Sequence, residues 1–294
     1  MSDAIAALIK GERLPQDYRE VVEQCWQPLA NRIAREATRR RPLIVGINGA
    51  QGSGKSTLCR FLEVLLKVRG LRVITLSIDD LYLTRAERAA MAQQVHPLFS
   101  TRGVPGTHAV GMALGIVEDM LAGRSFTLPR FDKASDDRMA EGETISGPVD
   151  VLLFEGWCVG AKPQDMAALA DPINALEAEE DRGGIWRALV NRFLTGDYAD
   201  LFAQIDLLVM LKVQGFEAVA ANRRRQEEKL AVANPGAPGL MDEAALQRFL
   251  SHYERLTRHM LAEMPGRADI VFEIGPDQRP LHLPDGLNGS FPIS

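Results

Sequence analysis

The chain has 294 residues, of which 46% are hydrophobic and 25% are charged, and its formal net charge is −5. Such a composition is ordinary for a globular protein, and the length can bury one large α/β core or two smaller ones. The acidic balance argues against a general nucleic-acid binder, whose surface is usually basic.

The N-terminal residues Met1 to Lys10 have no basic stretch before their short apolar run, so they do not form a convincing secretory signal. No apolar run in the chain approaches the roughly 20 residues that cross a bilayer. The cysteines, Cys25, Cys59 and Cys158, are too widely spaced for a disulfide framework or a metal knuckle. Reduced thiols are typical of the cytosol, so we expect a cytoplasmic protein with no membrane partner.

Helices and strands are predicted to alternate along the chain. Apolar residues from 17 to 40 recur at helical spacing, and Pro28 marks a kink or the start of a second helix. A second helical pattern covers residues 55–68. Short apolar runs predict buried strands at 42–47, 71–78, 149–154, 205–213 and 268–274. This alternation indicates an α/β fold with a doubly wound, mostly parallel sheet flanked by helices.

Two segments interrupt the alternation. Residues 81–147 carry Gly, Pro, His, Arg and Asp in irregular order, which is typical of binding loops or lids. Residues 234–239 read Asn-Pro-Gly-Ala-Pro-Gly and predict a loop.

The strongest local signal, from Gly49 to Ser56, matches the P-loop pattern in full, with a predicted strand before it and a predicted helix after it. Glycines let backbone N–H groups wrap a triphosphate, and the helix start adds partial positive charge. Lys55 can reach the β- and γ-phosphates of ATP, and the Ser56 hydroxyl can bind Mg²⁺. A chance glycine turn before a helix is the structural alternative. The candidate nucleotide-binding residues are Gly49, Ala50, Gln51, Gly52, Ser53, Gly54, Lys55, Ser56 and Thr57.

Two carboxylates, Asp79 and Asp80, follow the strand predicted at 71–78. Ligands of open α/β sheets bind outside the carboxyl ends of the strands, where a carboxylate can accept a proton from an attacking hydroxyl or orient it. Either aspartate can instead cap the next helix. The sequence leaves open which of the two is the candidate base.

Another carboxylate, Glu155, ends the strand predicted at 149–154. An acid in this position downstream of a P-loop holds Mg²⁺ directly or through water. Strands that end in an acid are also common by chance.

The insert and a later helix carry cations that suit an anionic ligand. In the insert these are Arg102, His108, Arg130, Lys133 and Arg138. A solvated surface is the commoner fate of Arg and Lys, and a single His is more often structural than catalytic. The run from Asn222 to Glu228 is either an exposed helix face or a lid whose arginine stabilises transition-state charge.

Together these motifs resemble the D-glycerate 3-kinase family, a branch of the P-loop kinases that also includes uridine kinase, phosphoribulokinase and bacterial pantothenate kinase. The carrying segments are 49–57, 77–84 (SIDDLYLT), 102–108 (RGVPGTH), 129–133 (PRFDK), 154–157 (FEGW), 224–228 (RRQEE) and 241–253. They follow the family's order over most of the chain from about Arg41 onward. The chain departs from the family pattern at Leu81, Phe131 and Asn222-Arg223.

The resemblance implies roles for individual residues. Asp79 falls at the position of the general base, Glu155 at the Mg²⁺-associated acid and Arg224 near the lid arginine. The acceptor region takes in Asp80, Tyr82, Arg102, His108, Arg130, Lys133 and Arg138. It also implies one domain over residues 1–294, with a helical lead-in at 1–40, an acceptor-binding insert at 81–147, and a lid with C-terminal helices at 215–265.

The sequence therefore predicts ATP- and Mg²⁺-dependent phosphorylation of a hydroxyl on a small anionic metabolite, D-glycerate first. A kinase of pantothenate, a nucleoside or a sugar is the nearest alternative. A nucleotide-binding regulator is a second one, although the Asn-Lys-x-Asp motif of a GTPase is missing from the sequence.

Overall fold

The computed structural model describes residues 2–233, 241–284 and 287. At its centre lies a five-stranded parallel sheet with the strand order β2-β7-β1-β8-β9. The strands are β1 (Leu43–Gly49), β2 (Val73–Ser77), β7 (Val151–Gly156), β8 (Leu207–Val213) and β9 (Ile270–Ile274). Each lies where the sequence predicted a strand, so the parallel α/β sheet is confirmed. The loop predicted at 234–239 lies outside the described residues.

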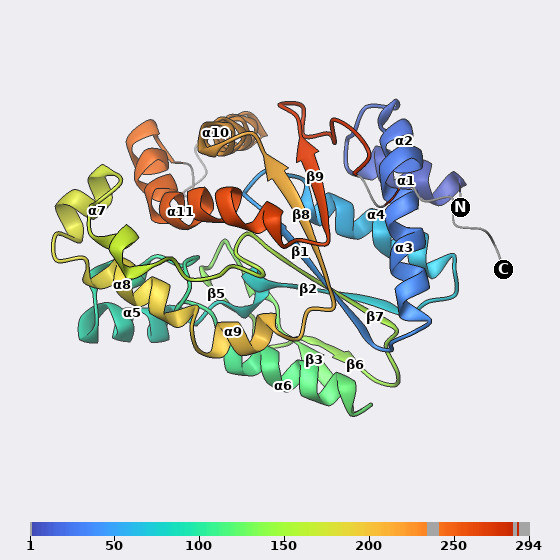
Figure 1. The fold of residues 1–294 in the computed structure, drawn as a ribbon, viewed down its shortest axis with the longest axis horizontal. Helices are drawn as coiled ribbons and strands as arrows, with labels where there is room; N and C mark the ends of the chain where they lie inside the picture. The colour runs from blue at the N-terminus through green and yellow to red at the C-terminus, as the bar shows by residue number, and fades with distance from the viewer. Residues whose placement is uncertain (1, 234–240, 285–286, 288–294) are drawn as a thin grey trace.

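Helices cover both faces of the sheet, because successive side chains of a strand point to opposite sides. In β1, Val45 and Ile47 face one core while Ile44 faces the other. The first core is covered by α1 (Ser2–Gly11), α3 (Gln27–Ala37) and α4 (Lys55–Lys67), and the second by α6 (Val110–Leu121) and α9 (Asp197–Phe202). Figure 1 shows these two groups of helices on opposite sides of the strands.

The N-terminal residues form the predicted helical lead-in. After α1 come α2 (Tyr18–Val21), the π-helical turn η1 (Val22–Trp26) and α3. Pro28 lies in the first turn of α3, directly after the π-helical turn, and the helical backbone runs on without a break from Tyr18 to Ala37. Trp26 and Leu29 are buried in the first core and fix this lead-in to the sheet.

The insert at 81–147 contains more regular structure than its composition predicted. Its helices are α5 (Arg85–Gln94) and α6, with the 3₁₀ turns η2 (Ile78–Leu81) and η3 (Pro97–Ser100). Two small antiparallel sheets pair β3 (Phe126–Leu128) with β6 (Glu143–Ile145), and β4 (Phe131–Asp132) with β5 (Asp137–Arg138). Helix α5 begins at a capping box, in which Thr84 and Glu87 accept each other's backbone N–H.

The second half of the chain adds helices between β7 and β8 and between β8 and β9. Between β7 and β8 lie η4 (Met166–Leu169), α7 (Ala175–Glu180), α8 (Ile185–Phe193) and α9; after β8 come α10 (Phe216–Ala233), α11 (Glu243–Glu263) and η5 (Met264–Gly266). Helix α11 contacts both cores, with Leu250 in the first and Leu256 in the second. The carboxyl ends of the strands therefore face these helices and the insert.

Candidate active site

A cavity of about 980 Å³ lies where the P-loop, η2 and the residues after β7 meet. In open parallel sheets this edge is the usual position of a ligand, and the volume suits a nucleotide with a small partner. The lining residues are Gln51, Gly52, Lys55, Ser56, Asp79, Tyr82, Arg88, Ser100, Thr101, Arg102, Lys133, Ala134, Asp136, Glu155, Gly156, Trp157, Arg223, Gln226, Glu227, Met241, Phe249 and Tyr253.

The P-loop turns tightly between β1 and α4. Gly52 and Gly54 have φ angles of 74° and 91°, a backbone conformation that a side chain would strain. Lys55 lines the cavity, and its Nζ donates to the Ala50 carbonyl at 3.2 Å. A glycine-rich turn, a lysine and a helix N-terminus thus face one cavity, which is an arrangement that can hold a polyphosphate.

Thr57, a predicted nucleotide-binding residue, and Asn222 of α10 lie outside the described lining of the cavity. Thr57 is directed to α1, with its hydroxyl 3.5 Å from a carboxylate oxygen of Glu12. Asn222 of α10 donates to the Gly52 carbonyl at 3.3 Å. A Cβ added at Gly52 would lie 2.8 Å from the Cβ of Asn222, so α10 sits directly on the loop.

Oxygen ligands for a cation converge beside the loop. The Ser56 hydroxyl donates to Glu155 Oε1 at 2.9 Å, and both side chains line the cavity. Among residues 2–233, 241–284 and 287, no cluster of three or more His, Cys, Asp or Glu could hold a metal alone. This sparse oxygen set fits Mg²⁺, which usually takes one or two protein ligands together with substrate phosphates and water.

Asp79 is engaged at both carboxylate oxygens. Its Oδ1 accepts from the Tyr82 hydroxyl at 2.6 Å and its Oδ2 accepts from Lys133 Nζ at 2.6 Å. Burial raises the pKa of Asp79, but the charge and hydrogen bond of Lys133, with the Tyr82 hydrogen bond and the Lys55 charge, bring that pKa below its ordinary value. Asp79 is therefore an ionised carboxylate at the cavity wall.

Asp80 and Arg130 face a different place. They line a separate cavity of about 350 Å³ beside β2, with Glu63 and Glu143. Arg130 donates to Asp80 at 3.4 Å and to Glu143 at 2.7 Å. Asp80 also accepts from the Phe131 N–H at 3.3 Å, so it fixes the start of β4. The structure thus separates Asp79 from Asp80 and does not bring Arg130 to the main cavity, contrary to expectation.

His108 and Arg138 both contact Tyr82, which lines the main cavity. His108 is buried, its ring stacks on Tyr82 at 4.9 Å between centroids, and its Nδ1 lies 2.6 Å from the Tyr198 hydroxyl. Burial lowers the pKa of His108 to about 4, although Asp79 opposes the shift. Arg138 donates to the Tyr82 carbonyl at 2.9 Å. Neither belongs to the described lining of the main cavity.

Arg102 lies in the cavity wall beside two groups that sequence reasoning missed. Its guanidinium pairs with Asp136, and Asp136 also binds the buried Arg88 at 2.9 Å. The Arg102 guanidinium carbon also lies 5.5 Å from the ring centroid of Phe131 and 6.0 Å from that of Tyr82. Arg102 is therefore held in place while its charge faces the cavity.

Two aromatic side chains clamp the backbone of Arg102 and Gly103. The Tyr253 hydroxyl donates to the Arg102 carbonyl at 2.9 Å, and Trp157 Nε1 donates to the Gly103 carbonyl at 2.8 Å. Their rings meet edge-to-face with centroids 4.9 Å apart. Gly103 has a φ of 130°, and a Cβ there would lie 2.0 Å from the Tyr253 hydroxyl oxygen. This clamp sets the position of Arg102.

The arginine of α10 that faces the cavity is Arg223. It lines the cavity and pairs with Glu227 one turn later. Arg224 is absent from the described lining and binds Glu243 of α11 at 2.6 Å on an exposed surface. Adjacent helical residues point about 100° apart, so a shift of one position moves the charge from the solvent to the site. The structure therefore places Arg223, and not the predicted Arg224, in the described cavity wall.

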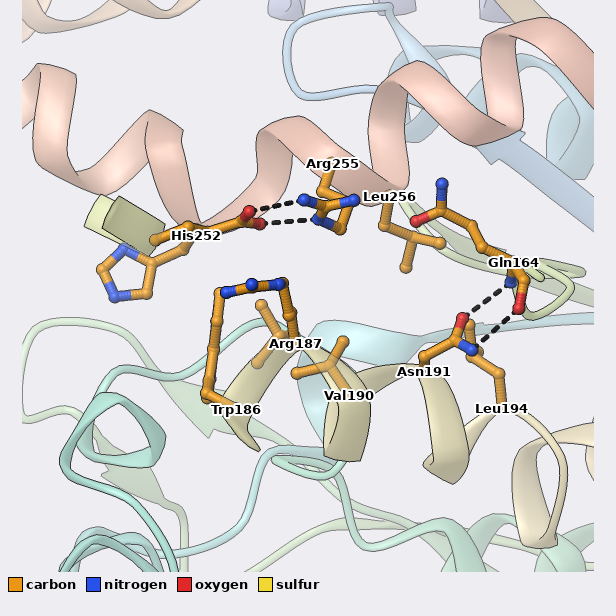
Figure 2. Close-up of a pocket in the computed structure, with 11 residues that line it drawn as sticks. Gln164, Trp186, Arg187, Val190, Asn191, Leu194, His252, Arg255 and Leu256 are labelled. Atoms are coloured by element: carbon orange, nitrogen blue, oxygen red, sulfur yellow. Dashed lines mark hydrogen bonds and ion pairs between the residues drawn. The ribbon is translucent and has the colours of Figure 1, made fainter. Parts of the chain in front are cut away.

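A further, much smaller cavity lies between α8 and α11 (Figure 2). Its volume is about 20 Å³, which is room for a water molecule but not for a metabolite. Around it, Asn191 and Gln164 exchange two hydrogen bonds, and Glu177 binds Arg255 at 2.6 and 2.7 Å. The Asn191–Gln164 bonds join the two ends of the segment from 164 to 191, and the Glu177–Arg255 pair ties this segment to α11, which carries Tyr253.

Within the part of the chain that the structure describes, no helix combines the length and the apolar character needed to cross a membrane. Cys25, Cys59 and Cys158 are free and buried.

Comparison with known proteins identifies kinases. No protein-family model matches the chain. It is 34% identical over 225 residues to an uncharacterized kinase of Schizosaccharomyces pombe, covering 72% of this chain and 79% of that protein. It is 30% identical over 261 residues to the chloroplastic D-glycerate 3-kinase of Arabidopsis thaliana, covering 82% of this chain but only 54% of that protein. The solved D-glycerate 3-kinase of Cryptococcus neoformans has a TM-score of 0.70 and 25% identity, over 87% of this chain and 97% of that one.

Proposed function

The chain belongs to the D-glycerate 3-kinase family of P-loop kinases, and we propose that it transfers the γ-phosphoryl group of ATP to a hydroxyl of D-glycerate. One observation carries this proposal: the P-loop lysine Lys55, the carboxylate of Asp79 and the cation of Lys133 line one cavity. A nucleotide-binding regulator would not need a base and cations beside the γ-phosphate position.

In the proposed reaction, the acceptor hydroxyl oxygen attacks the γ-phosphorus. A new O–P bond forms, the bond to the bridging oxygen breaks, and its electron pair leaves with ADP. Asp79 orients the hydroxyl and takes its proton. Lys55 and Arg223 supply positive charge to the phosphate oxygens as charge redistributes in the transition state.

Ser56 and Glu155 would hold Mg²⁺, directly or through water, beside the P-loop. When bound, the ion neutralises negative charge on the phosphates. Arg102 and Lys133 then remain for the acceptor carboxylate. Their presence favours a hydroxy acid over a neutral sugar or nucleoside.

We also propose which segments of the chain bind the acceptor and which form the lid. Residues 81–147 form the acceptor-binding insert, and 215–265 form the lid with the C-terminal helices. Tyr82 acts by holding Asp79, because its hydroxyl is already bonded to that carboxylate. Asp80, Arg130, His108 and Arg138 shape the insert from outside the main cavity.

An acceptor panel with coupled detection of ADP tests the proposal. D-glycerate, pantothenate, uridine and neutral sugars are compared at equal concentration, with and without Mg²⁺. D-glycerate is expected to be the fastest acceptor, and faster turnover of uridine or pantothenate would overturn the substrate assignment. Asp79→Asn should keep ATP binding, measured by titration calorimetry, and lose roughly 10²–10⁴-fold in rate. The matched control Asp200→Asn changes an exposed aspartate of α9 and should retain wild-type rates.

A further inference from the structure

The ion pair between Asp79 and Lys133 joins two parts of the site with different rigidity. Asp79 follows β2 in the 3₁₀ turn η2, which is anchored by the buried Ile78 and Leu81. Lys133 lies in the turn between β4 and β5, whose register consists of Phe131 with Arg138 and Asp132 with Asp137. The Lys133 side chain is 60% exposed and that of Asp79 is 32% exposed. The lysine is therefore the partner that can move.

Lys133 is also the cation best placed to change partners. Arg102 is paired with Asp136 and held over two aromatic rings, and Arg223 is paired with Glu227. Lys55 sits in the P-loop, where phosphates are its natural partner. An exposed lysine–carboxylate pair is weakly held, because water screens it and the long side chain is restricted by it. A second carboxylate in the cavity can compete for it.

We propose that Lys133 stays paired with the ionised Asp79 until the carboxylate of an acceptor draws the lysine away. An anionic acceptor thereby frees the base that removes its own hydroxyl proton. This inference rests on the proposed function and assigns Lys133 a positioning and specificity role beyond acceptor binding. Before the exchange, Asp79 accepts from both Lys133 and Tyr82. After it, Asp79 keeps Tyr82 and turns its freed oxygen to the acceptor hydroxyl.

The exchange has two chemical consequences. A carboxylate bonded to an ammonium is a poor proton acceptor, and the lowered pKa of Asp79 agrees with this. A neutral triol such as glycerol can present a hydroxyl but has no charge with which to take Lys133. Water likewise cannot release the base, so attack of water on ATP, giving ADP and phosphate with the proton on Asp79, is suppressed while the acceptor is absent.

Lys133→Met tests the inference because it removes the charge and keeps much of the side-chain length. Lys133→Arg keeps a cation, and Lys162→Met makes the same change at an exposed lysine outside the cavity. Two quantities are measured for each: ADP release without any acceptor, and the ratio of kcat/KM for D-glycerate to that for glycerol. Thermal unfolding checks that the variants fold.

Lys133→Met should raise acceptor-free ADP release and lower the D-glycerate to glycerol ratio, each by roughly tenfold, a part of the usual contribution of a general base. Lys133→Arg should keep acceptor-free ADP release low, because it retains a cation beside Asp79, and Lys162→Met should match wild type in both assays. If Lys133→Met raises only the KM for D-glycerate and leaves ADP release unchanged, the lysine is an acceptor contact alone and the inference fails.

The acceptor-free measurement separates this inference from the proposed function. If wild-type protein does not phosphorylate D-glycerate, the proposed substrate is wrong, yet ADP release still reports on the pair. A rise in Lys133→Met would then support the restraint on Asp79, and no rise would overturn it. If Lys133→Met misfolds, Lys133→Gln replaces it in the same two assays.

Discussion

Replacing Gly103 by alanine should displace the Tyr253 hydroxyl and so disrupt the contact that positions Arg102. The added Cβ would lie 2.0 Å from the hydroxyl oxygen of Tyr253 and 2.6 Å from its Cζ. The Tyr253 ring is buried and packs on Trp157 and Phe249 at 4.9 Å between centroids, so it cannot step aside cheaply. A backbone conformation that is essentially restricted to glycine costs another residue about 1–3 kcal/mol, and overpacking adds about 1–3 kcal/mol. The free energy of unfolding should therefore fall by roughly 2–6 kcal/mol.

Urea denaturation of Gly103→Ala and of the matched Gly115→Ala measures this effect. Gly115 is exposed within α6 with no atom near its Cβ position, so alanine there should raise stability by up to about 1 kcal/mol through helix propensity. Gly103→Ala should also raise the KM for the acceptor, because Arg102 moves with the clamp. Stability of Gly103→Ala within about 0.5 kcal/mol of wild type, the usual range of a surface change, would refute the clamp.

Two further predictions concern Arg223, which lines the cavity, and His108, which is buried against Tyr82. Arg223→Ala should lower kcat at saturating ATP by roughly tenfold or more, because Arg223 lines the cavity proposed to hold the phosphates, whereas the exposed Arg224 pairs with Glu243 and Arg224→Ala should stay near wild type. The reverse order in steady-state assays would return the lid role to Arg224. His108 has a folded-state pKa of about 4 against an ordinary value of 6.5, so its neutral form is required, and the stability it contributes is present above pH 6.5 and lost as the pH falls toward 4. Denaturation across this range should show a decline up to about 3 kcal/mol larger in wild type than in His108→Phe, and equal slopes would contradict the burial of a neutral ring.

The sequence predicted the sheet well because its strands are short, continuous apolar runs. Burial on both faces leaves few polar residues in β1, β7 and β8, and that pattern is readable without any tertiary contact. The insert was harder to predict, because glycines, prolines and charges conceal α5 and α6. One signal was available: Thr84 and Glu87 have the spacing of a capping box and mark the start of α5.

The sequence located residues of the site along the chain, but it did not show which way their side chains point. Asp79 and Asp80 are neighbours, yet η2 sends one to the main cavity and the other to Arg130. Arg223 and Arg224 differ in the same way on α10, whose rotation is set by Asn222 against the P-loop. Tyr253 lies on a helix 151 residues after Arg102 in the sequence. No local sequence pattern could therefore predict the hydrogen bond between them.

The path of the chain around the sheet has a consequence for how such enzymes diversify. Lys55 and Ser56 come from the connection between β1 and α4, whereas Asp79, Arg102 and Lys133 all lie on the single crossover that leaves β2 and returns at β7. The proposed acceptor-binding and phosphate-binding residues therefore lie on separate connections of the sheet. Substitutions in the crossover between β2 and β7 can alter the proposed acceptor pocket while the P-loop sequence stays unchanged.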